Sequence, residues 1–183
     1  MLTEIQRQSL LRIARSSIAA VLDGSQPELD ASAIDDTLRK PAGAFVTLKT
    51  KSDDLRGCVG SIHPVAPLYQ AVSISAVNAA FRDPRFVPLK KHELELIVME
   101  ISVMGPIVRC STEEIVVGRD GLIITQGRNA GLLLPQVAIE YRWTREEFLR
   151  HTCMKAGLAP DTWQQAACRI EKFEAEVFGE ASD

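Results

Sequence analysis

Apolar residues recur at helical spacing in three stretches of the chain. The first covers residues 3–22, starts with a capping box of the Thr-x-x-Gln type and is followed by Gly24 and Pro27, which end it. The second covers residues 64–81, opens with two prolines and is rich in small side chains. The third covers residues 144–157, where a second capping box precedes an apolar face and a final glycine. These patterns predict three helices.

Runs of branched and aromatic residues bounded by turn residues predict strands. Such runs cover residues 44–49, 55–62, 95–104, 122–125, 132–134 and 170–178. The first pair and the pair around residues 127–131 have the short polar connections of hairpins. The last run mixes apolar residues with glutamates, which is typical of an exposed or edge strand.

Helices and strands intermingle without a regular βαβ rhythm, and the hairpins imply antiparallel pairing. This order predicts an α+β fold, with helices packed on an antiparallel sheet. The polar stretch over residues 26–41 reads as a connection, and no linker is long enough to separate two independent domains. We therefore expect residues 1–183 to form a single domain.

The composition is that of a globular protein, with 46% hydrophobic and 25% charged residues. A net charge of −3 argues against nucleic-acid binding. Arginines interrupt the first 22 residues, so they do not resemble a signal peptide, and the apolar run over residues 96–104 is too short to span a bilayer. We expect a soluble, cytoplasmic protein without membrane partners.

The hexapeptide over residues 55–60 places a cation, a thiol and two glycines in one predicted strand. Strand alternation puts Arg56, Cys58 and Gly60 on one face, and Gly57 on the other. Glycine within a strand often marks a bulge or a place where a ligand or another backbone comes close. A guanidinium beside a thiol favours the nucleophilic thiolate. The segment is therefore a candidate site.

Cys58 has two interpretations at this point. It is either a reactive group, as a nucleophile or a covalent carrier, or a small core residue, since free cysteine is among the most buried residue types. Nucleophilic catalysis needs a base, and His63 lies five residues further along the chain. A Cys–His pair is the candidate arrangement.

Two arginines just after the second predicted helix extend this site. Arg82 and Arg85, together with Arg56, could converge on a carboxylate or phosphate, because the planar guanidinium suits bidentate anion binding. Alternatively, Asp83 pairs with one of them and fixes the turn at Pro84. The sequence leaves both interpretations open.

The other three cysteines, Cys110, Cys153 and Cys168, are widely spaced and read as reduced thiols, with Cys153 on an apolar helix face. No paired cysteines or His-Glu-x-x-His pattern are present, so no metal site is expected. The sequence leaves any cofactor undetermined.

Several segments together resemble one known family. They are the hexapeptide Leu55–Gly60, Phe81–Phe86, Gly118–Leu122, Leu132–Val137 and Lys155–Leu158. In this order they are similar to the pattern of the AMMECR-type proteins, called AmmeMemoRadiSam system protein A in microbes. The hexapeptide departs from the usual pattern only at Val59, where isoleucine is more common. The resemblance runs from about Leu10 to Glu180.

The resemblance implies a two-lobed α+β domain with a cleft near the hexapeptide. It also implies two partners, a MEMO-type protein related to extradiol dioxygenases and a radical-SAM protein, but no established reaction. Two functions are therefore carried forward: an enzyme or enzyme component acting on a small anionic metabolite, and a non-catalytic partner or delivery module for these two proteins. The candidate catalytic residues are Cys58, Arg56 and His63, and the candidate substrate-binding residues are Gly57, Gly60, Arg82, Asp83 and Arg85.

Overall fold

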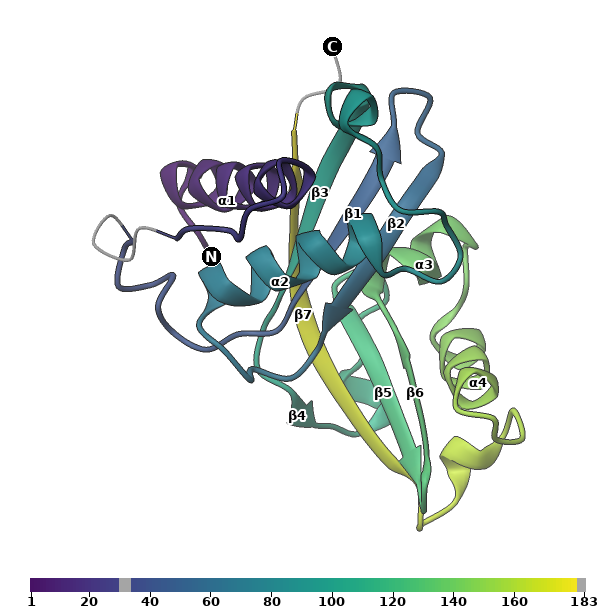
Figure 1. The fold of residues 1–183 in the computed structure, drawn as a ribbon. Coiled ribbons are helices and arrows are strands. Elements are labelled where there is room, and N and C mark those ends of the chain that lie inside the picture. Colours follow the sequence, from purple (N-terminus) through teal and green to yellow (C-terminus); the bar gives the residue numbers. More distant parts are fainter. Residues whose placement is uncertain (30–33, 181–183) are drawn as a thin grey trace. The chain divides into compact units, whose positions relative to one another are not determined.

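The computed structural model describes residues 1–29 and 34–180 of the chain. It divides into two compact units, one made of residues 1–104 with the C-terminal segment from Glu176, and the other of residues 105–175. Each contains helices and antiparallel strands (Figure 1), so the predicted α+β class is confirmed. The cleft and the single-domain assignment stay predictions. Of the connection predicted over residues 26–41, residues 30–33 lie outside the described part of the chain.

Unit 1 begins with α1, Glu4–Leu22, at the predicted place. Its N-cap is Thr3, whose side chain accepts a hydrogen bond from the Gln6 N–H, while the Gln6 side chain accepts one from the Thr3 N–H. This reciprocal bonding satisfies two of the backbone donors that a helix start leaves unpaired. Gly24, with φ 75°, follows the helix in the left-handed conformation that favours glycine.

The unit 1 sheet has the order β2-β1-β3, followed by the end of β7. Its strands are β1 Ala44–Thr50, β2 Leu55–Ser61, β3 Ile97–Met104 and β7 Arg169–Gly179. β1 and β2 form the predicted hairpin, and β1 pairs with β3 in an unbroken antiparallel register. β3 begins later than predicted, because residues Lys91–Leu96 form a 3-10 helix, η2.

Helices α1 and α2, the latter Leu68–Phe81, cover one face of this sheet (Figure 1). Small side chains let α2 approach other backbones closely, as the sequence predicts. Its Ser73 hydroxyl is hydrogen-bonded to Ser17 of α1 at 2.8 Å in the buried interface. A Cβ atom on Gly57 of β2 would lie 2.2 Å from the Ala79 carbonyl oxygen, a distance that no side chain tolerates. Gly57 is therefore required for packing between β2 and α2.

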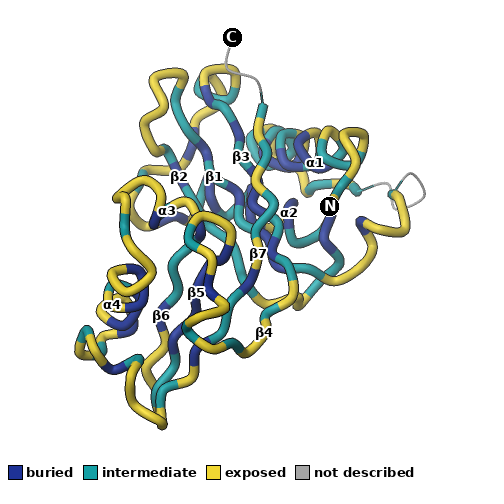
Figure 2. The backbone as a smooth tube through the Cα atoms, turned by 180° about the vertical axis from the view of Figure 1, so that it is seen from behind, coloured by how far each residue is buried: buried dark blue, intermediate teal, exposed yellow. Residues whose placement is uncertain are grey.

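Unit 2 is built around a second small core. Its elements are β4 Val108–Arg109, η3 Thr112–Glu114, β5 Asp120–Gln126, β6 Asn129–Leu133, α3 Pro135–Glu140, α4 Arg145–Lys155, η4 Thr162–Gln164 and the first part of β7. Phe148, Leu149 and Cys153 of α4 pack on Leu122 and Ile124 of β5. Figure 2 shows α4 buried on the side toward β6 and exposed on the opposite side. Cys153 is thus a core residue, as its helix position predicts.

The prediction that residues 170–178 form an exposed or edge strand is wrong. β7 pairs with β5 on one side and with β4 on the other, and its Phe173 is almost fully buried. The glutamates Glu171 and Glu176 are only partly exposed, and Glu176 forms an ion pair with Arg7 of α1, so they do not mark an unpaired edge. Composition alone does not distinguish a central strand with one wet face from an edge strand.

No helix in residues 1–29 and 34–180 is both long and apolar enough to cross a membrane. The cytoplasmic location stays a prediction.

Candidate functional site

Cys58 lies in the middle of β2, the outer strand of the unit 1 sheet. The peptide groups of an outer strand need partners other than a neighbouring strand. The Cys58 N–H donates to Asp83 Oδ2 at 2.9 Å, and the Cys58 carbonyl accepts from Arg85 Nη2 at 3.3 Å. One ion pair therefore satisfies both backbone groups of the cysteine. We call Asp83 and Arg85 the edge clamp.

The edge clamp is itself tightly bonded. Asp83 Oδ1 accepts from the backbone N–H of Arg85 at 3.1 Å and from its Nε at 3.0 Å, and Oδ2 accepts from Arg85 Nη2 at 2.7 Å. The Asp83 side chain is only 2% exposed. Hydrogen bonding to Arg85 holds the pKa of the Asp83 carboxyl well below its usual range, against the opposing effect of burial. Of the two interpretations that the sequence left open, pairing of Asp83 with an arginine is the one observed.

Arg85 is the cation next to Cys58. Its side chain is 53% exposed, and its guanidinium lies 5.5 Å from the centre of the Phe86 ring. The hydrogen bond with Asp83 raises the pKa of Arg85, so the guanidinium is permanently charged. Its Nη1 atom makes no hydrogen bond within the described part of the chain, which leaves donors for a ligand.

Arg56 is engaged by a carboxylate of η2. Its guanidinium binds Glu93 of η2 through Nε at 3.0 Å and Nη2 at 3.3 Å, and this contact lowers the pKa of Glu93. The Arg56 side chain is only 12% exposed, and its Nη1 is buried without a hydrogen-bond partner. Arg56 therefore links β2 to η2. The carboxylate lies 37 residues away in the sequence, and support of the thiol by Arg56 stays a prediction.

Cys58 is partly buried, and among the described residues its thiol has one hydrogen-bond partner. Thr47 of β1 lies directly opposite Cys58, and its Oγ1 donates to the sulfur at 3.3 Å. Sequence reasoning missed Thr47 and Glu93. The hairpin register could have indicated Thr47, because a loop over residues 51–54 already brings these two strands together.

His63 lies after the end of β2 and is exposed. Its backbone N–H is hydrogen-bonded to Ser61 Oγ at 3.1 Å. Within residues 1–29 and 34–180, the structure has no hydrogen bond between its imidazole and Cys58. The two candidate catalytic groups are therefore not paired, and a catalytic role of His63 stays a prediction.

The remaining candidate residues have different surroundings. Arg82 is exposed at the end of α2, and in the part of the chain that the structure describes its side chain has no hydrogen bond or ion pair. A Cβ on Gly60 would lie 2.3 Å from the Ala44 carbonyl oxygen, so Gly60 permits close packing between strands, as Gly57 does between strand and helix. Both glycines serve close backbone approach. Arg82 remains available to an anion.

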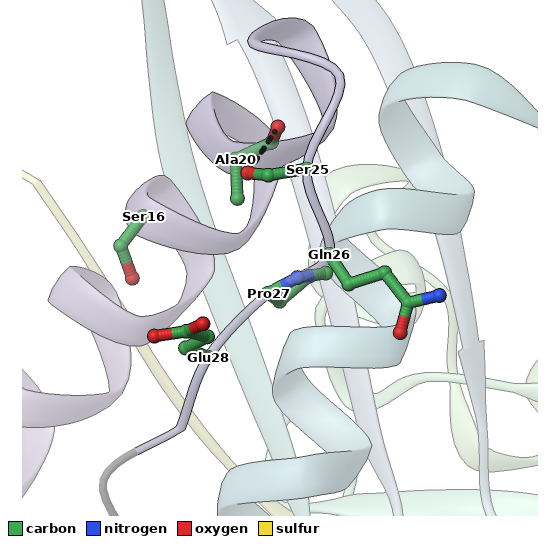
Figure 3. A pocket seen from close by; sticks show the side chains of 6 residues that line it. All are labelled: Ser16, Ala20, Ser25, Gln26, Pro27 and Glu28. Carbon is green, nitrogen blue, oxygen red and sulfur yellow. Dashed lines mark hydrogen bonds between the residues drawn. The ribbon is translucent and has the colours of Figure 1, made fainter.

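Two hollows lie away from Cys58. One, of about 490 Å³, is lined by Ser16 and Ala20 of α1 and by residues 25–28 (Figure 3). The Ser25 hydroxyl in this hollow is already bonded to the Ala20 carbonyl. The other, of about 300 Å³ in unit 2, contains Cys110 and Cys168. Burial raises the pKa of both thiols, which makes them poor nucleophiles near neutral pH.

Among the described residues, no group of three or more histidine, cysteine or acidic side chains is placed to hold a metal ion. What the Cys58 region offers is the thiol of a partly buried cysteine, a hydroxyl that donates to it and guanidinium groups nearby. This set can attack or carry an electrophile and can bind an anionic substituent.

Comparison with known proteins identifies the family. The AMMECR1 family model matches residues 11–178. A protein of Methanothermobacter thermautotrophicus is 43% identical over 98% of this chain and 96% of its own length, and a Pyrococcus furiosus protein is 43% identical over 93% and 86%. The crystal structure of an uncharacterised Pyrococcus horikoshii protein superposes with a TM-score of 0.89, at 38% identity, over 98% of this chain and 93% of that one. The chain therefore belongs to the AMMECR1 family.

Proposed function

We propose that this chain is an enzyme, or the enzyme component of an assembly, that acts on a small anionic metabolite through the Cys58 thiol. The observation that carries the proposal is that Cys58 is only partly buried and lies on a peptide that the edge clamp binds at both its N–H and its carbonyl. A reactive group held by a fixed backbone keeps its orientation during the reaction. The reducing cytoplasm, where we expect the protein to work, would keep this sulfur as a free thiol.

Charge supports an anionic substrate. Arg85 contacts the Cys58 carbonyl, is half-exposed and has N–H groups that no residue in the described ranges uses. Arg82 is exposed and similarly unengaged within those ranges. A carboxylate or phosphate offers the paired acceptor oxygens that a guanidinium binds best. Arg85 would orient such a group while Cys58 attacks the electrophilic centre next to it.

The test compares two alkylating reagents of nearly equal size, anionic iodoacetate and neutral iodoacetamide. Their rates are measured at Cys58 and at Cys110 in the same intact protein by peptide-resolved mass spectrometry. We expect Cys58 to react faster than Cys110 with both reagents, and its iodoacetate-to-iodoacetamide ratio to be several-fold higher. Equal alkylation rates at Cys58 and Cys110 would rule out Cys58 as an activated nucleophile. Equal iodoacetate-to-iodoacetamide ratios at the two cysteines would rule out a preference for anions.

Arg82→Gln gives the matched variant, because Arg82 is exposed and its loss leaves the packing intact. Loss of this exposed charge should lower the iodoacetate rate at Cys58 by about twofold, since water screens the attraction between a surface charge and the reagent. The iodoacetamide rate should not change. Arg128→Gln, an equally exposed arginine in the turn between β5 and β6 of unit 2, is the control. A similar loss in both variants would indicate net charge alone.

One observation favours a second candidate, a non-catalytic partner or delivery module for the MEMO-type and radical-SAM proteins. Arg56 and Arg85 are both bound by carboxylates, and no imidazole is hydrogen-bonded to Cys58 in the described residues. Purified candidate partners would be tested for complex formation with wild type and with Cys58→Ala. This role would be favoured over catalysis if Cys58→Ala still forms the complex and the pathway of these partners still yields its product at the wild-type level.

A further inference from the structure

A row of reactive and charged side chains crosses the helix-free face of the unit 1 sheet. Thr47 of β1 lies directly opposite Cys58 of β2 and also directly opposite Glu100 of β3. Directly opposed residues project from the same face, with Cβ atoms about 4.5 to 5.5 Å apart. The Thr47 hydroxyl therefore stands between a thiol on one side and a carboxylate on the other.

The hydroxyl has one hydrogen to donate, so these two acceptors compete for it. In the structure, Thr47 Oγ1 donates to Cys58 Sγ at 3.3 Å. Glu100 lies instead with its Oε2 3.7 Å from Lys49 Nζ. An ionised carboxylate is a strong hydrogen-bond acceptor. The Glu100 carboxylate is thus engaged by Lys49, and without this ion pair it would compete for the Thr47 hydrogen bond.

Lys49 is held in this role by a second contact. Its Nζ lies 3.1 Å from Asp53 in the β1–β2 turn, and Asp53 and Glu100 raise the pKa of Lys49 and keep it charged. Arg82 at the end of α2 is exposed, η2 also carries Lys91, His92 and Glu95, and the remaining charged groups near Cys58 are Arg56, Asp83, Arg85 and Glu93. Arg56 pairs with Glu93 and Arg85 with Asp83, so each of these four already has a partner of opposite charge.

We infer that Thr47 is a further catalytic residue at Cys58 and that Lys49 is a positioning residue that keeps Glu100 from taking the Thr47 hydrogen bond. The thiol proton leaves to solvent when the sulfur ionises, and Thr47 keeps its own proton and donates it as a hydrogen bond to the resulting thiolate. A hydrogen bond to the charged form stabilises that form. The inference rests on the proposed function, since it assigns the group that prepares Cys58 for attack.

Thr47→Val removes the hydroxyl and preserves the side-chain shape, and Thr47→Ser retains the hydroxyl. The iodoacetamide rate at Cys58 is followed in the intact protein over about pH 6 to pH 10, the range in which thiols ionise. We expect Thr47→Val to slow alkylation at neutral pH about tenfold and to move the pH–rate curve to higher pH, as loss of a charge-assisted hydrogen bond requires. Thr47→Ser should stay within about twofold of wild type.

Lys49→Met tests the competition. It should slow alkylation of Cys58 in the wild-type background, because the freed Glu100 then takes the hydrogen. In the Thr47→Val background, Lys49→Met should not slow the alkylation of Cys58 further, because valine has no hydroxyl hydrogen that Glu100 could accept. Adding Glu100→Gln to Lys49→Met should restore most of the rate. Further slowing in the Thr47→Val background would show that charge acts directly on the sulfur, and it would overturn the role of Lys49.

Cys110 in the same protein reports general reactivity, and circular dichroism of each variant checks that the fold is retained. An unchanged rate in folded Thr47→Val would overturn the role of Thr47. If Thr47→Val does not fold, a Thr47→Ser variant that loses the rate while folded would overturn it equally. Wild-type Cys58 that reacts no faster than Cys110 would instead refute the proposed function itself, so the two failures are distinguishable.

Discussion

Asp83→Asn is the most informative single change, because it replaces one carboxylate oxygen of the edge clamp with an NH2 group. All four hydrogen bonds to Asp83 come from donors: Oδ1 accepts two from Arg85, and Oδ2 accepts one from Arg85 and one from Cys58. Whichever way the amide is turned, two of these donors then face another donor. The substitution keeps the volume of the side chain and removes half of its hydrogen bonds.

The expected cost follows from these contacts. A buried backbone N–H that loses its partner costs about 1 to 3 kcal/mol. The lost contacts of Arg85 cost less, because its side chain is 53% exposed and water replaces part of the interaction. We therefore expect the free energy of unfolding to fall by about 2 kcal/mol, which for a chain of this size lowers Tm by roughly 4 to 8 °C.

Urea unfolding at neutral pH measures the loss, and hydrogen exchange of the Cys58 amide locates it at the edge of β2. The pH dependence gives a second readout. The folded-state pKa of Asp83 lies below its unfolded value, so its stabilisation is fully present above the ordinary aspartate pKa of 3.8 and is lost as pH falls toward the folded pKa. The difference between wild type and Asp83→Asn should therefore narrow only below about pH 4.

Asp36→Asn is the control, because Asp36 is fully exposed and its ion pair with Arg39 is long, at 3.8 Å. It should unfold at the wild-type urea concentration. If Asp83→Asn also does so, and its Cys58 amide exchanges no faster, the edge clamp does not hold β2 and the reasoning fails.

Three further outcomes are expected. Gly57→Ala should lower the free energy of unfolding by about 1 to 3 kcal/mol, because the new Cβ meets the Ala79 carbonyl at 2.2 Å, and an unchanged urea midpoint would contradict this packing. Arg56→Met should destabilise by about 1 to 2 kcal/mol but leave alkylation of Cys58 within about twofold, since Arg56 binds Glu93; a tenfold slower reaction would restore its role beside the thiol. Cys110 should be alkylated slowly at pH near neutral and faster as pH rises, because burial raises its pKa, whereas equal rates in folded and urea-unfolded protein would refute this.

The local elements were predictable because their signals lie within a few residues. The Thr3 and Thr144 capping boxes start α1 and α4 where expected, and the hairpin of β1 and β2 forms around a short polar loop. The long strand was placed too early, because η2 ends only at Leu96. β7 was misjudged as an edge strand, because the number of neighbours a strand has is a property of the assembled sheet.

The centre of the candidate site was also visible in the sequence, since a thiol, a cation and two glycines within six residues are unusual in a strand. The hydrogen-bond and ion-pair partners of these residues could not be seen in the sequence. Arg56 forms its ion pair with Glu93, 37 positions away in the sequence. Thr47 donates its hydrogen bond to the Cys58 sulfur from the neighbouring strand. Sequence proximity suggested Arg56 and His63 as helpers of Cys58, whereas the contacts observed come from Thr47 and Arg85.

The sequence by itself determined the helices, most strands, the α+β class and the kinship of the chain, because hydrophobic period, capping and turn residues act over one or two turns of backbone. Only the tertiary structure decided which carboxylate neutralises which arginine and which hydroxyl meets the thiol. Hydrogen bonds and ion pairs form between atoms that are about 3 Å apart in space, and that separation follows from the register of the strands and the packing of the loop at Asp83 against β2.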